Sequence, residues 1–152
     1  MPNQSKRRKV LFLCTGNSCR SQMAEGWVRK LKGDVIEAYS AGAEARGLDP
    51  RAVQVMAGAG VDISGQRSKS VDEFKDTAFD FVITVCDSAR ASCPIFQGPA
   101  KAVHVGFDDP PYLAKDARTE EEALRHYRRV RDEIRAYVKT LPDALTNGER
   151  TV

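Results

Sequence analysis

Short apolar segments alternate with helical patterns along most of this 152-residue chain. Four runs have the length and composition of buried strands: residues 9–14, 35–40, 79–86 and 102–107. Strands that are apolar on both faces and separated by helices are typical of a parallel sheet. The sequence therefore predicts an α/β fold of three layers, in which a central four-stranded parallel sheet is flanked by helices.

Two helices are predicted in the first half of the chain. Residues 21–32 carry apolar side chains at helical spacing, and Gly33 ends the pattern. A second helix begins at Asp49, a favoured N-cap, with Pro50 at its first position and Gly60 at its end. The side chains expected to face the core in this helix are Ala52, Val53, Met56 and Ala59.

The last predicted helix begins at Thr119, which forms a capping box with Glu122. It ends before Pro142. Its inner stripe is expected to consist of Leu124, Tyr127, Val130, Ile134, Val138 and Leu141. We expect residues 1–152 to form a single catalytic domain, in which residues 1–8 and 143–152 are flexible tails and fraying begins at Pro142.

The composition is that of an ordinary globular protein, with 41% hydrophobic and 30% charged residues. The net charge of +3 gives no reason to expect a nucleic-acid partner. The basic run at residues 6–9 is interpreted as a solvated entry to the first strand; the alternative is an arm that binds nucleic acid or anionic lipid. Because no apolar run approaches the ~20 residues of a membrane span, we expect a cytoplasmic protein without a membrane partner. A monomer is expected.

Four cysteines, Cys14, Cys19, Cys86 and Cys93, are not expected to form structural disulfides in a reducing compartment. They have neither C-x-x-C spacing nor a paired histidine, so we predict no metal site and no cofactor. A chemical role for these cysteines is the better interpretation. Cys14, Cys86 and the pair Asp108/Asp109 all follow predicted strands, and the carboxyl edge of a parallel sheet is where active sites lie.

The loop after the first strand has the composition of an oxyanion site. A strand–loop–helix turn directs backbone N–H groups to one point, where the helix N-terminus adds partial positive charge. Gly16 and Asn17 tolerate left-handed backbone, and Arg20 offers two donors to an oxyanion. In that field the pKa of Cys14 is expected to fall well below its usual value of about 8.5. The residues expected to bind the substrate are Thr15, Gly16, Asn17, Ser18, Cys19, Arg20 and Ser21.

The alternative is that Cys14 is a small buried residue and Arg20 a surface charge. Cys19 is interpreted as a packing residue rather than a redox residue, and Ser21 as a donor to the Cys14 sulfur or a helix cap.

This loop resembles, in its letters CTGNSCRS, the signature loop of the low-molecular-weight tyrosine phosphatase fold. With Gln22 after the second serine, the longer stretch CTGNSCRSQMAEGW is similar to the thioredoxin-coupled arsenate reductases built on that fold. Two further segments support the same resemblance. Residues 84–94, TVCDSARASCP, resemble the redox segment of these reductases, and residues 106–110, GFDDP, resemble the general-acid loop of both branches.

The resemblance implies that Cys14 attacks arsenate, Asp109 protonates the departing oxygen, and Cys86 and then Cys93 complete a disulfide relay reduced by thioredoxin. A dithiol that becomes a disulfide supplies the two electrons that such a reduction needs. Asp108 or Asp109 is alternatively a cap before the following prolines. The competing functions are a tyrosine phosphatase that uses Cys14, Arg20 and Asp109, and a non-catalytic oxyanion-binding or redox-sensing module.

Two expectations concern local structure. Residues 86 and 93 would be ~10.5 Å apart along a continuous helix, whereas bridged cysteines need Cα atoms within ~7 Å, so residues 87–92 must be loop or unwind on oxidation. Some related reductases bind potassium at positions that correspond to Asn17, Glu25 and Ser40. Lys69 takes the place of the acid that would complete this site, and we predict that its ammonium group replaces the ion.

Overall fold

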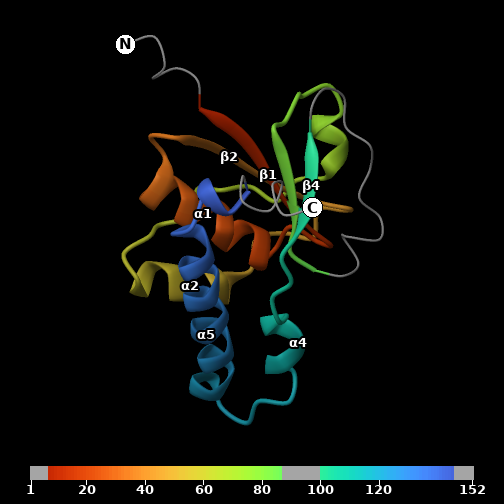
Figure 1. The fold of residues 1–152 in the computed structure, drawn as a ribbon. Coiled ribbons are helices and arrows are strands. Elements are labelled where there is room, and N and C mark those ends of the chain that lie inside the picture. Colours follow the sequence, from red (N-terminus) through yellow and green to blue (C-terminus); the bar gives the residue numbers. More distant parts are fainter. Residues whose placement is uncertain (1–6, 87–99, 146–152) are drawn as a thin grey trace.

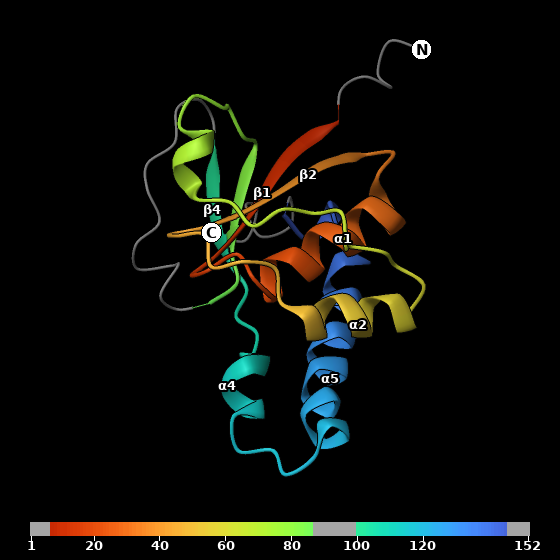
Figure 2. The same cartoon turned by 180° about the vertical axis from the view of Figure 1, so that it is seen from behind.

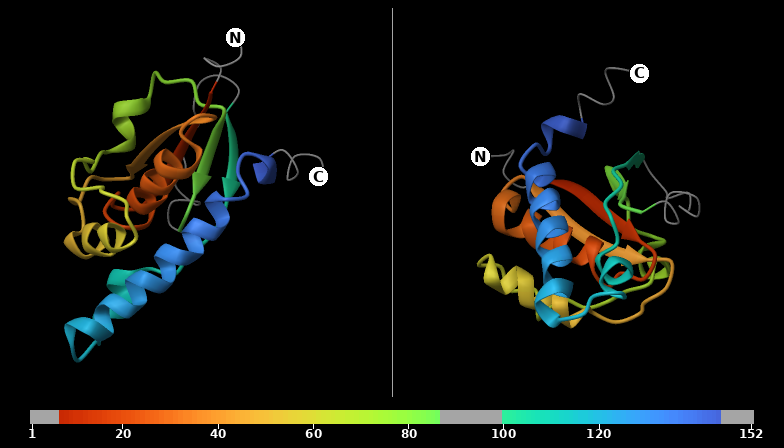
Figure 3. Two further views of the ribbon diagram at one scale, coloured as in Figure 1. Left: turned by 90° about the vertical axis from the view of Figure 1, so that its left-hand side faces the viewer. Right: turned by 90° about the horizontal axis from the view of Figure 1, so that it is seen from below.

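The computed structural model describes residues 7–86 and 100–145. Its sheet contains β1 (Arg8–Cys14), β2 (Ile36–Gly42), β3 (Phe81–Thr84) and β4 (Lys101–His104) in the order β2-β1-β3-β4. All three strand pairs are parallel, and Figure 3 shows the four arrows side by side. The predicted four-stranded parallel sheet is confirmed.

The register of the sheet places the C-terminal ends of β1, β2 and β3 at the same level. Cys14 pairs with Gly42, and Leu13 pairs with Thr84, so the segments that follow β1, β2 and β3 leave the sheet at one edge. β1 lies between β2 and β3, and its residues from Val10 to Cys14 are buried. A central strand with this burial is expected to be apolar throughout, which explains the sequence VLFLC.

The helices with defined bounds in the described part of the chain are α1 (Arg20–Lys32), α2 (Pro50–Gly58), α4 (Pro110–Ala114) and α5 (Glu120–Val138). α1 packs on β1 and β2 and also on α5. α2 crosses α5, and α4 lies beside the N-terminal part of α5 (Figures 1 and 2). Over the residues described, none of these helices combines the length and the apolar character needed to cross a membrane.

The other face of the sheet is covered in part by a short 3-10 helix, η2 (Val71–Phe74). Ser40 bonds to Glu25 of α1, so alternate residues of β2 face α1 and Tyr39 points to the opposite face. There its ring packs edge-on against Phe74 and Phe79, with ring centroids 5.5 and 5.3 Å apart. The predicted three layers are therefore present.

The predicted N-caps of α2 and α5 are confirmed. Asp49 Oδ1 accepts the N–H of Arg51 at 2.9 Å, and Thr119 Oγ1 accepts the N–H of Glu122 at 3.0 Å. The predicted inner face of α2 needs correction, because Val55 is buried, whereas Val53 and Ala59 are only half-buried and Ala59 follows the end of the helix. The predicted stripe of α5 is buried from Leu124 to Val138.

Where the structure describes the expected tails, regular structure extends further toward both ends of the chain than predicted. Arg8 belongs to β1, and the chain continues in ordered form past Pro142. The N–H of Leu145 donates to the carbonyl of Pro142 at 3.0 Å, and Leu145 is 2% exposed. An apolar side chain buried at this position holds residues 143–145 on the core, so the prediction of fraying from Pro142 is wrong there. Residues 146–152 lie outside the described part.

Candidate functional site

The loop that joins β1 to α1 is built around Asn17. This residue has φ of 49°, in the left-handed region, and is the single non-glycine residue with positive φ in the described part of the chain. Its amide donates to Ser21 Oγ at 2.8 Å, and its Oδ1 accepts from Gln22 Nε2 at 2.9 Å and from the N–H of Lys69 at 2.7 Å. A fully buried side chain with three bonds fixes this otherwise unfavourable backbone conformation.

A second segment holds the loop from outside. The carbonyl oxygens of the loop accept N–H groups from residues 43–49, at distances from 3.0 to 3.3 Å. The pairs, donor first, are Ala43 with Cys14, Glu44 with Thr15, Arg46 with Gly16, and Asp49 with Ser18. Gly42 permits this approach, because a Cβ there would lie 2.6 Å from the backbone nitrogen of Asn17. Since the carbonyls point outward, the N–H groups on the other side of the loop remain for an anion.

A cavity of about 580 Å³ opens at this loop and brings most of the predicted residues together. It is lined by Cys14, Thr15, Gly16, Ser18, Cys19, Arg20, Arg46, Cys86, Asp109 and Pro111. Asn17 and Ser21 do not line it, because both are buried behind the loop and brace it. Cys93 lies outside the described residues.

Arg20 begins α1 and lies at the wall of this cavity. Its NH1 group donates to the carbonyl of Phe107 at 3.0 Å, and its NH2 group lies 3.6 Å from Asp109 Oδ1. Its Nε is buried and has no hydrogen-bond partner within the described residues. A buried guanidinium donor without an acceptor is rare in proteins, and an oxyanion in the loop would supply the missing acceptor.

The structure separates the two aspartates that precede Pro110. Asp108 pairs with Arg129 of α5, with Oδ2 3.0 Å from NH2. Asp109 instead lines the cavity beside Arg20, and its side chain makes no cap bond to α4. The geometry therefore favours Asp109 over Asp108 as the general acid. The sequence favoured this choice only through its resemblance to the family.

Cys14 lies against Cys86 at the floor of the cavity. Both thiols line the cavity, and a hydrogen bond of 3.2 Å joins Thr15 Oγ1 to Cys86 Sγ. The neighbouring Cys86 thiol and burial raise the pKa of Cys14, and they outweigh Arg20 and the N–H of Thr15, which lower it. The prediction of a lowered pKa is therefore wrong for this arrangement, because the sequence did not reveal that a second thiol occupies the site.

Cys19 is the third cysteine of the described part, and no disulfide joins these three to one another. It is 3% exposed, and burial, with a further contribution from Asp49, raises its pKa. A buried thiol that stays protonated is unreactive, which favours the predicted packing role.

The predicted cation position contains a lysine. Ser40 Oγ donates to Glu25 Oε1 at 2.5 Å, and Lys69 Nζ lies 3.9 Å from the same carboxylate oxygen. Lys69 Nζ also donates to the carbonyl of Arg67 at 2.5 Å, and burial lowers the pKa of Lys69. Across the residues described, no group of three or more His, Cys, Asp or Glu side chains is placed to hold a metal ion.

Two functional positions were missed by the sequence reasoning. Gln22, read only as a family marker, is fully buried and donates to the carbonyls of Asn17 and Arg67, each at 3.1 Å. Its Oε1 accepts from Gln66 Nε2 at 2.7 Å, so it ties the loop to a distant segment. Arg46, at the cavity mouth, has no local sequence signal, because the contact of β2 with β1 brings it there.

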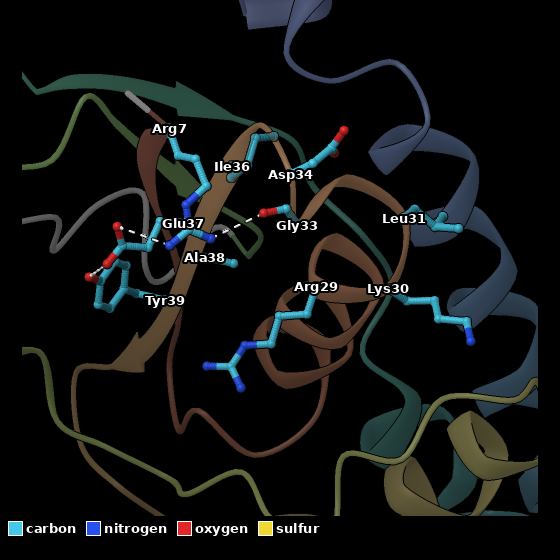
Figure 4. A pocket seen from close by; sticks show the side chains of 10 residues that line it. All are labelled: Arg7, Arg29, Lys30, Leu31, Gly33, Asp34, Ile36, Glu37, Ala38 and Tyr39. Carbon is cyan, nitrogen blue, oxygen red and sulfur yellow. Dashed lines mark hydrogen bonds and ion pairs between the residues drawn. The ribbon is translucent and has the colours of Figure 1, made fainter. Parts of the chain in front are cut away.

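A larger cavity of about 830 Å³ lies away from these residues. Figure 4 shows that its lining comes from the end of α1 and the start of β2, with Arg7 bonded to Gly33 and Glu37. Its charges are mixed, and none of the described cysteines lines it. The chemistry therefore points to the smaller cavity.

The family model of low molecular weight phosphotyrosine protein phosphatases matches residues 9–150. The chain belongs to this family. Within the family, the chain is 47% identical over 137 residues to an arsenate reductase of Halalkalibacterium halodurans, a match that covers 90% of this chain and 96% of that protein. An arsenate reductase of Bacillus licheniformis is 50% identical to the chain over 133 residues, a match that covers 88% of this chain and 94% of that protein.

Solved structures of both branches of the family share the fold. An arsenate reductase in its phosphate-binding state superposes with a TM-score of 0.69 at 32% identity, over 88% of this chain and 95% of that one. A low molecular weight protein tyrosine phosphatase from T. tengcongensis gives the same TM-score at 28% identity, over 90% and 99% of the two chains. The fold alone therefore does not separate reductase from phosphatase.

Proposed function

We propose that this protein reduces arsenate to arsenite through a relay of cysteines. The observation that carries the proposal is that two buried thiols, Cys14 and Cys86, line the same oxyanion cradle. A phosphatase needs one thiol there, whereas a reductase needs two. The curated relatives at 47% and 50% identity, which are arsenate reductases, support the same function.

The substrate would bind with its oxygens on the N–H groups of the loop and on Arg20. Among the described residues, these N–H groups at residues 16–19 have no other acceptor, and neither has Arg20 Nε. The Cys14 thiol gives its proton to an oxygen of the bound arsenate, and the resulting thiolate attacks arsenic and forms a sulfur–arsenic bond. Asp109, which faces the same cavity, donates a proton to the departing oxygen, which leaves as water.

The second step transfers electrons. Cys86 Sγ attacks Cys14 Sγ, a disulfide forms, and the sulfur–arsenic bond breaks with its electron pair going to arsenic. Arsenic is thereby reduced from the +5 to the +3 state, and the two thiols are oxidised. Both sulfurs belong to residues that line the same cavity, and Cys86 is the largest influence on the pKa of Cys14, so the two side chains are neighbours. Thr15 contacts Cys86 through its hydroxyl and Cys14 through its N–H, and therefore positions both partners.

The third step returns Cys14 to its thiol form. Cys93 would attack Cys86, form the Cys86–Cys93 disulfide and expel Cys14 as thiolate. Residues 87–99, and Cys93 with them, lie outside the described residues, so this step rests on the sequence. The dithiol of thioredoxin would then reduce the final disulfide. We expect the relay to work in a monomer.

The test is arsenate-dependent oxidation of NADPH in the presence of thioredoxin and thioredoxin reductase. Cys14→Ser and Cys86→Ser should each abolish arsenite formation. Cys93→Ser should release about one arsenite per protein and then stop, because Cys14–Cys86 can form but cannot be resolved. Multiple turnover by Cys93→Ser at the wild-type rate would refute the relay.

The same variants test the competing phosphatase. Cys14, Arg20 and Asp109 line one cavity, and these three residues suffice for hydrolysis of a phosphate ester. Hydrolysis of p-nitrophenyl phosphate should depend on Cys14 but survive in Cys86→Ser and Cys93→Ser. If the wild type hydrolyses this ester efficiently and forms no arsenite, the protein is a phosphatase.

A further inference from the structure

Arg46 is the second arginine at the catalytic cavity. It follows β2 in the segment that braces the loop, and it lines the cavity together with Cys14 and Arg20. Unlike Arg20, it lies at the mouth, with 57% of its side chain exposed. Because only 10% of the Arg20 side chain is exposed, an approaching anion meets the Arg46 guanidinium first.

The position of Arg46 is fixed by the loop itself. Its N–H donates to the carbonyl of Gly16 at 3.0 Å, and its aliphatic stem lies on Gly16. A Cβ at position 16 would come within 2.7 Å of Arg46 Cδ, so the glycine leaves the space that the stem fills. Ser68 strengthens the contact, because its hydroxyl donates to the carbonyl of Gly16 and accepts the N–H of Gly47. A seated stem limits the guanidinium to the cavity mouth.

Glu44 holds the guanidinium from one side. Nε and NH2 of Arg46 both donate to the same oxygen, Glu44 Oε2, at 3.1 and 2.6 Å. Within the described residues, the NH1 group has no partner, and it remains for a ligand. The pair is solvent-exposed, with 57% and 61% of the two side chains accessible, so it is weak enough to open when an anion competes.

We propose that Arg46 captures the incoming tetrahedral oxyanion at the mouth of the cavity and that Glu44 limits this capture. The inference rests on the proposed function for the identity of the oxyanion, arsenate. Arg46 acts on binding, whereas Arg20 and the loop hold the anion during the chemical step. Removal of Arg46 should therefore raise KM and leave kcat nearly unchanged.

The first experiment compares Arg46→Gln with wild type. We expect the KM for arsenate and the Kd for inorganic phosphate, measured by calorimetry, to rise about threefold to tenfold while kcat changes less than about twofold. The difference should narrow in high salt, because exposed charges are screened. Arg128→Gln is the matched control: Arg128 forms an exposed forked pair with Glu121 on α5, and it does not line the cavity.

A second variant is expected to strengthen phosphate binding. Glu44→Gln removes the carboxylate that occupies Arg46, so the phosphate Kd should fall below the wild-type value, and Arg46→Gln should cancel this gain in the double variant. A phosphate Kd in Arg46→Gln equal to that of Arg128→Gln, or a gain in Glu44→Gln that persists without Arg46, would overturn the inference. Because phosphate binding needs no turnover, this result stands apart from failure of arsenate reduction.

Discussion

At the scale of single residues, the Cys14 thiol lies between opposing influences. Cys86 and burial raise its pKa, whereas Arg20 and the N–H of Thr15 lower it. Cys86→Ala removes the largest of the raising causes, so we expect the pKa of Cys14 to fall. The alkylation rate of Cys14 by iodoacetamide, followed by mass spectrometry as a function of pH, measures this shift directly.

The control for this prediction is Cys19→Ser, which removes a thiol that is not among the influences on Cys14 and should leave its pKa in place. A rise in the Cys14 pKa on removal of Cys86 would show that the Cys86 thiol donates to a Cys14 thiolate in the native protein. In that case Cys14 would be the first sulfur to ionise, and the sign of the coupling given above would be reversed.

At the scale of elements, Asp49 joins α2 to α5. Its Oδ1 caps α2 through the N–H of Arg51, and its Oδ2 accepts the hydroxyl of Tyr127 at 2.7 Å. Tyr127 is 2% exposed. Asp49→Ala should lower the free energy of unfolding by about 2–4 kcal/mol, because it removes a helix cap and leaves a buried hydroxyl unpaired. Urea unfolding followed by circular dichroism gives this value.

Tyr127→Phe separates the two contributions, since it removes the hydroxyl and keeps the cap. We expect it to cost about 1 kcal/mol, and adding Asp49→Ala to it should then cost less than Asp49→Ala does alone. Equal effects in both backgrounds would mean that the bond between α2 and α5 contributes nothing to stability.

At the scale of the whole molecule, the sequence predicted features that depend on neighbours along the chain. The left-handed Asn17 and the cap at Asp49 follow from residue type and local spacing. Arg46 could not be found in this way, because it reaches Gly16 only through the pairing of β2 with β1. The pKa of Cys14 was mispredicted for the same reason: Cys86 lies 72 residues away and arrives through β3.

The buried carboxylate of Glu25 also joins distant parts of the molecule, since α1, β2 and the segment before η2 meet at its oxygens through Ser40 and Lys69. Because Arg29 and the ammonium group of Lys69 already pair with this carboxylate, the melting temperature should be the same in potassium and in sodium chloride. Lys69→Asp should lower the melting temperature by several degrees in sodium, because like charges then face each other in a buried site.

Potassium should restore part of that loss by binding the native state, whereas Lys69→Met, which adds no carboxylate, should respond equally to both salts. Scanning calorimetry of the three proteins in matched salts decides the point, and a wild type that is markedly more stable in potassium would show that Lys69 does not replace the ion.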